Sequence, residues 1–138
     1  MTRLNEDLYE FAEQLNIKIL SFNLPNCESL SICDGDDYYI GIDDKQINNS
    51  ANERVHIAHE LGHCETGAFY NEFSPVDTTK KCEEVADRWA IRKLIDKDKF
   101  LDMLELGYDI WELAEYFNVT EDYIKKAYKL YFEIKPVM

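Results

Sequence analysis

A single five-residue motif, His-Glu-Leu-Gly-His at residues 59–63, constrains this chain more than any other stretch of its sequence. Histidines at positions i and i+4 of a helix lie on one face, one turn apart, so both imidazoles can reach one metal ion. The flanking residues favour that helix, because Ser50 and Glu53 have the spacing of a capping box and Gly67 is a suitable helix stop. We therefore predict a helix from Ser50 to about Gly67 whose two motif histidines hold a zinc ion.

The other polar side chains of this helix have different expected roles. Glu60 projects beside the histidine face, where its carboxylate can accept a proton from a water molecule. His56 shares that face, but the rise from His56 to His63 is roughly 10 Å, too far for one ion to bind both. We expect His56 to support the site, to face a substrate, or merely to belong to the polar face. Cys64 points about 100° away from its neighbour His63, so we do not expect it to be a ligand.

A third metal ligand must come from another element, because a catalytic zinc usually has three protein ligands and one open position for water. The segment KKCEEVADRWA, residues 80–90, supplies carboxylates on the next expected helix. Glu83 and Asp87 are four residues apart and can both face the histidines. One can bind the ion while the other orients a ligand histidine through its free ring N–H. We favour Glu83 as the ligand, with Glu84 and Asp87 as alternatives.

The hydrophobic pattern of the whole chain predicts an α+β fold in a single domain, residues 1–138. Apolar residues recur at helical spacing over residues 3–15, and three short β-prone runs follow, which we expect to form a small antiparallel meander. Residues 68–79 have the character of an irregular connection, and helices are expected from Lys80 onward. These strands and C-terminal helices are expected at residues 17–22, 29–33 and 38–43, then at 80–94, at 98–107 with Asp98 as N-cap, and at 109–117 and 121–133 with Thr120 as N-cap of the last.

The net charge of −13 argues against a phosphate-rich partner such as DNA or an anionic membrane. The expected helix pair within residues 108–134 has helix-turn-helix spacing, yet residues 109–124 contain five acidic residues and no Lys or Arg. A DNA-reading helix needs cations, so we expect this pair to pack on the rest of the domain or to dock a partner. The chain has no apolar run of membrane-spanning length, no signal peptide and no CxxC pair, so we expect a cytoplasmic protein.

Two segments together, HELGHCETGAFYN and EEVADRWAIRKLI, closely resemble the ImmA/IrrE-type metallo-endopeptidases over roughly residues 35–130. The resemblance implies a minimal zincin-like fold in which His59, His63 and Glu83 bind zinc. It further implies that Glu60 is the catalytic base and that Asp87 supports a ligand histidine. Relatives are often encoded by phages and mobile elements and cleave a helix-turn-helix repressor, so the implied partner is a DNA-binding repressor that serves as protein substrate.

These observations combine into the hypothesis of an endopeptidase with one zinc ion, which hydrolyses a peptide bond with a metal-activated water. Tyr70 and His56 are candidates to donate to the oxyanion or to contact the substrate. The strand around Tyr38–Ile42 is expected to lie at a sheet edge and to pair with an extended substrate. The competing hypothesis is a non-catalytic metal-containing module that sequesters a regulator, which a closed four-ligand site including Cys64 or Cys82 would favour.

Overall fold

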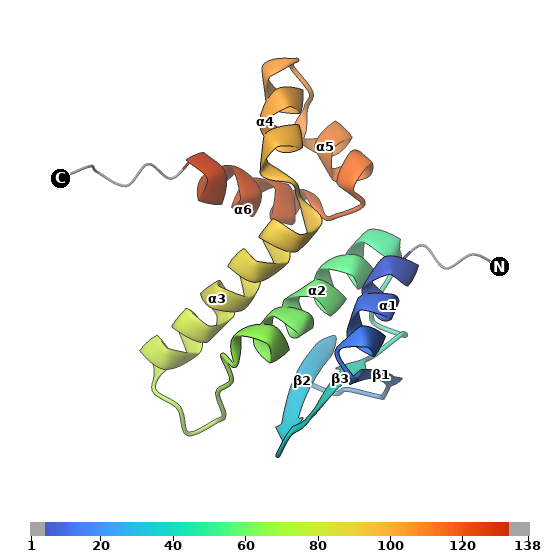
Figure 1. Ribbon diagram of the computed structural model, residues 1–138, viewed down its shortest axis with the longest axis vertical. Coiled ribbons are helices and arrows are strands. Elements are labelled where there is room, and N and C mark those ends of the chain that lie inside the picture. The colour runs from blue at the N-terminus through green and yellow to red at the C-terminus, as the bar shows by residue number, and fades with distance from the viewer. Residues whose placement is uncertain (1–4, 133–138) are drawn as a thin grey trace.

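The computed structural model describes residues 5–132, and its mixture of helices with a small three-stranded sheet confirms the predicted α+β class. An N-terminal helix precedes the sheet, and helices occupy the rest of the described chain (Figure 1). None of the helices in this described part is both long and apolar enough to span a membrane. The elements in chain order are α1 (Glu6–Gln14), β1 (Ile17–Ser21), β2 (Ser29–Asp34), β3 (Asp37–Ile42), α2 (Ser50–Thr66), α3 (Val76–Leu94), α4 (Lys97–Glu105), α5 (Ile110–Phe117) and α6 (Glu121–Phe132).

The sheet has the strand order β1-β3-β2, so the predicted antiparallel meander is wrong. β2 and β3 form a hairpin whose turn contains Gly35 at φ +63°, but β1 pairs with β3 in parallel. The cause is the connection at residues 22–28, which carries the chain past β3 before β2 begins. Tyr38–Ile42 therefore belongs to the central strand, and the edge beside α2 is β2.

The connection between β1 and β2 is held by the carboxylate of Asp43, which follows β3. Its Oδ2 accepts from the backbone N–H of Leu24 at 2.9 Å and from Nε2 of Gln46 at 2.8 Å. The same Gln46 amide donates to the carbonyl oxygens of Leu24 and Cys27. Asp43 thus fixes the backbone that leads directly into Glu28 and the start of β2.

The N-cap of α2 is Asn49 rather than the predicted Ser50, because Asn49 Oδ1 accepts from the backbone N–H of Asn52 at 2.8 Å. The Ser50 and Glu53 side chains make tertiary contacts instead. Ser50 Oγ accepts from the Asn118 amide at 2.8 Å, and Glu53 Oε1 accepts from the Asn5 amide at 2.7 Å. The predicted end of the helix is confirmed, since its C-cap Gly67 has φ +70°.

The later helix boundaries correct two predictions and confirm a third. α3 begins at Val76 directly after Pro75, so residues 76–79 are helical and not part of the irregular connection. Asp96, not Asp98, caps α4 by accepting from the Lys99 N–H at 2.9 Å. Thr120 Oγ1 accepts from the Tyr123 N–H at 3.2 Å, as expected of the N-cap of α6.

Helix α2 lies between the sheet and α3, with α1 on the sheet side (Figure 1). The two long helices are in close contact at Gly62, where a Cβ would lie 2.6 Å from the carbonyl oxygen of Ala86. α6 packs against α3, and the Tyr131 hydroxyl donates to the carbonyl of Ile95 at 2.5 Å. This stacking of α2, α3 and α6 brings residues far apart in sequence to one place, with a core that includes Ile40, Ile57, Leu61, Ala86, Ala90, Phe100, Leu113 and Ile124.

Candidate metal centre

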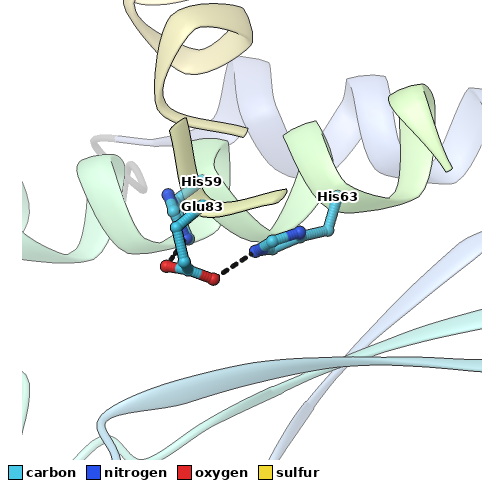
Figure 2. Close-up of side chains that lie close together, drawn as sticks. All are labelled: His59, His63 and Glu83. Carbon is cyan, nitrogen blue, oxygen red and sulfur yellow. Dashed lines mark hydrogen bonds and ion pairs between the residues drawn. The ribbon is translucent and has the colours of Figure 1, made fainter. Parts of the chain in front are cut away.

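The packed helices α2 and α3 bring two histidines and one carboxylate together (Figure 2). His59 and His63 come from α2, and Glu83 comes from α3. Nε2 of His59 lies 2.9 Å from Glu83 Oε2, and Nε2 of His63 lies 2.9 Å from Glu83 Oε1. One ligand atom from each residue lies within 4.8 Å of the other two, so a single ion can reach all three.

The orientation of both imidazole rings is set by partners on their other nitrogen. Nδ1 of His59 lies 2.8 Å from Asp87 Oδ1, and Nδ1 of His63 lies 2.5 Å from the carbonyl oxygen of Ala68. Both partners only accept, so each Nδ1 carries a proton and each Nε2 is directed at Glu83. Two nitrogen donors and one carboxylate with this outer support are a donor set that suits a divalent zinc ion.

The same contacts shift the pKa values of the three groups in the metal-free protein. Burial lowers the pKa of His59, but the hydrogen bonds to Asp87 and Glu83 outweigh burial and raise it to about 10. The hydrogen bonds from His59 and His63 hold the pKa of Glu83 far below its ordinary value. The three residues His59, His63 and Glu83, called the triad below, therefore retain protons that a metal ion must displace when it binds.

Asp87, which supports His59, is itself held by helix α6. The Tyr123 hydroxyl donates to Asp87 Oδ1 at 2.9 Å, and the Lys126 ammonium donates to Oδ2 at 3.0 Å. Sequence reasoning missed both α6 residues, because they lie 36 and 39 positions away and belong to no motif. The only available signal was the lack of DNA-binding character in this helix pair, which favoured packing.

Glu60 lies beside the triad and is only 6% exposed. Its Oε2 accepts from the hydroxyl of Ser29 at 2.7 Å, and Ser29 is the first residue of strand β2. Sequence reasoning missed Ser29 as well, because a single serine in a β-prone run carries no motif. Glu60, the triad and β2 line one open cleft of about 530 Å³.

Of the remaining candidate residues, Tyr70 contacts the triad, whereas His56 and Glu84 do not. The Tyr70 hydroxyl donates to Glu83 Oε1 at 2.9 Å, and burial together with that carboxylate raises the pKa of Tyr70 to about 12. His56 lies outside the triad and contacts Ser29 and Glu28 instead. Glu84 is exposed on α3, and within residues 5–132 no cysteine sulfur joins the group of possible ligands.

A known protein family matches most of the described chain. The model of a peptidase family, described as the IrrE N-terminal-like domain, matches residues 12–129. The matched region contains α2 and α3 entirely, and with them the triad, Glu60 and Asp87. The chain matches no curated protein and no solved structure at a significant level.

Proposed function

The chain belongs to the IrrE N-terminal-like peptidase family, and from that premise we propose that it is a zinc-dependent endopeptidase. The proposed substrate is the helix-turn-helix repressor of a phage or mobile element. The observation that carries the catalytic part is the arrangement of His59, His63 and Glu83, whose ligand atoms converge while both histidine Nδ1 atoms have acceptors. Three protein ligands leave a position open, which is typical of catalytic rather than structural zinc sites.

Different residues of the chain have separate roles around such an ion: binding it, orienting a ligand and accepting a proton. Zinc held there would supply Lewis acidity, which polarises a carbonyl and makes a water molecule more acidic. His59, His63 and Glu83 hold the ion, and Asp87 keeps His59 in the tautomer that offers Nε2. Glu60 has the position and chemistry of the general base, which accepts the proton of the attacking water and passes it to the leaving amine.

Tyr70 is the better of the two candidates for stabilising the oxyanion. Its hydroxyl already lies in the cleft against Glu83, and its raised pKa keeps it a donor at neutral pH. His56 is less suited to this role, because its two ring nitrogens already contact Ser29 and Glu28. We therefore assign the oxyanion contact to Tyr70.

An extended substrate would enter along β2. This strand forms one edge of the sheet and lines the cleft together with the catalytic residues. Backbone groups on a free strand edge can pair with a peptide and hold it in register, as in other cases of strand addition. The peptide bond to be cut would then pass between β2 and the metal ligands of α2.

The test is cleavage of the helix-turn-helix repressor encoded nearest to the gene of this protein. We expect the zinc-loaded protein to cut the repressor and a chelator to stop the cut. Glu60→Gln should bind one zinc ion per chain but cleave at least about 100-fold more slowly, since a positioned general base contributes about 10²–10⁴ to the rate. Glu65→Gln, at an exposed position on the same helix, is the matched control and should cleave normally.

Two results would contradict this proposal in different ways. Cleavage by Glu60→Gln at the wild-type rate would exclude the mechanism. A repressor that binds the zinc-loaded protein and stays intact would favour the alternative function, a metal-containing module that sequesters a regulator.

A further inference from the structure

A chain of hydrogen bonds connects the start of strand β2 to the proposed catalytic base. The hydroxyl of Ser29 lies 2.7 Å from Glu60 Oε2 and 2.8 Å from His56 Nδ1. On the far side of the ring, His56 Nε2 lies 2.5 Å from Glu28 Oε2. Four side chains from β2, its preceding residue and α2 thus form one continuous line that ends at Glu60.

With both carboxylates ionised, one direction satisfies every group along this line, and it requires a proton on each ring nitrogen of His56. The hydroxyl of Ser29 has a single proton, and an ionised carboxylate can only accept, so this proton points to Glu60. The Ser29 oxygen must then accept from Nδ1 of His56. The carboxylate of Glu28 is also an acceptor, so it takes the proton on Nε2. Each group is satisfied, and the hydroxyl of Ser29 is held pointing at Glu60.

We infer that Ser29 is a positioning residue for Glu60, oriented in turn by His56 and Glu28. This inference rests on the proposed function. Ser29 engages Oε2 alone, which leaves Oε1 of Glu60 for the attacking water and restricts rotation of the carboxylate. Misplacement of a reacting group by about 1 Å can cost about 10²-fold in rate, so such a restraint matters for a base.

The location of Ser29 links this restraint to substrate binding. Ser29 opens the edge strand that lines the cleft, and its carboxylate partner Glu60 is almost fully buried. The strand expected to pair with the substrate therefore also carries the residue that orients the base. A purely structural hydrogen bond would stabilise the fold at this point without affecting kcat.

The experiment compares two isosteric substitutions of Ser29 in the zinc-loaded, full-length protein with the repressor as substrate. Ser29→Thr keeps the hydroxyl and Ser29→Val removes it, while both have the same shape and suit a strand. We expect Ser29→Val to lower kcat by about 10- to 100-fold with KM and zinc content unchanged, and Ser29→Thr to keep most of the rate. Ser21→Val, which removes an exposed hydroxyl from strand β1 outside the cleft, is the matched control and should leave kcat unchanged.

A second measurement needs neither zinc nor substrate. In metal-free protein, the ¹H–¹⁵N NMR correlations of the His56 ring should show a hydrogen-bonded Nδ1 proton in wild type and Ser29→Thr, and should lose it in Ser29→Val. If Ser29→Val and Ser29→Thr have equal kcat, or if wild type lacks that proton, the inference is wrong while the proposed function stands. If wild-type protein with zinc leaves the repressor uncut, the proposed function fails, and the inference fails with it.

Discussion

The phenol of Tyr123 donates to Asp87 Oδ1 at 2.9 Å, and the same carboxylate oxygen lies 2.8 Å from Nδ1 of His59. Two hydrogen bonds in series therefore connect helix α6 to a proposed metal ligand on α2. The aromatic ring of Tyr123 is buried, so its hydroxyl is held in place by packing. Helix α6 thereby holds Asp87, the partner of His59 in the candidate metal centre.

Removing this hydroxyl should weaken metal binding. Tyr123→Phe keeps the buried ring but leaves Asp87 with one donor fewer, so His59 is oriented less firmly. We expect zinc affinity to fall by about tenfold, at the lower end of the effect of such outer partners. Competition with a chromophoric chelator measures it. Tyr128→Phe, at an exposed position of the same helix, should bind zinc like wild type, and equal affinities for all three proteins would contradict the coupling.

Substitutions at two neighbouring acids separate the possible third ligands. Glu83→Gln replaces the carboxylate that contacts both histidines and should weaken zinc binding by at least about 100-fold, more than the loss of an outer partner. Glu84→Gln changes an exposed side chain and should leave affinity unchanged. Zinc per chain after dialysis, measured by elemental analysis, checks both. Loss of zinc only in Glu84→Gln would reverse the assignment.

Gly62 should tolerate no side chain. In Gly62→Ala the new methyl would lie 2.6 Å from the backbone oxygen of Ala86, so α3 must move. We expect a loss of about 1–3 kcal/mol in the free energy of unfolding, typical of overpacking, together with weaker zinc binding. Gly35→Ala has open space around it and is strained only by its φ of +63°. It should lose stability by about 1–2 kcal/mol without any change in zinc affinity. If both variants bind zinc equally well, the close helix contact does not position Glu83.

The carboxylate of Asp43 should make stability depend on acid pH. Hydrogen bonds from the backbone of Leu24 and the side chain of Gln46 hold the pKa of Asp43 below its ordinary value of 3.8. A lowered folded-state pKa contributes stability above pH 3.8, and that contribution is lost as pH falls through the folded-state value.

Urea unfolding of Asp43→Asn across a pH series tests this dependence. At pH 6 the variant should have a lower urea midpoint of unfolding than wild type. This difference in midpoint, called the gap below, should disappear as pH falls below 3.8. Asp36→Asn, at an exposed position in the β2–β3 turn, should show no gap at any pH. A gap for Asp43→Asn that stays constant down to pH 2 would assign the effect to amide packing instead of charge.

The parts of this fold that sequence reasoning predicted are those with local causes. The α2 helix, its end at Gly67 and the placement of His59 and His63 on one face follow from spacing and from a left-handed glycine. The predicted sheet order was wrong, because strand pairing depends on the path of residues 22–28. Asp43, 19 positions after Leu24, holds that path by accepting a hydrogen bond from the Leu24 N–H. The N-cap of α2 is Asn49 and not the predicted Ser50, because the Ser50 hydroxyl instead accepts a hydrogen bond from the Asn118 amide.

The candidate site divides in the same way. Helical periodicity predicts that His59 and His63 share a face. Glu83 was the favoured third residue on the next helix, ahead of Glu84 and Asp87, and the structure brings Glu83 to the two histidines. Ser29 and Tyr123 could not be found, because each reaches the site through tertiary packing of a strand or helix whose own sequence has no motif.

The missing side chain at Gly62 has a consequence for anyone who wishes to transplant this site. The closeness of α2 and α3 there determines how far a ligand on α3 must reach, and glutamate is already the longest natural carboxylate. If the two helices of a host scaffold lie further apart, no longer natural carboxylate can replace glutamate and reach the ion. A designer who grafts the three proposed ligands onto another helical pair must copy the interhelical distance first, and the glycine that permits it.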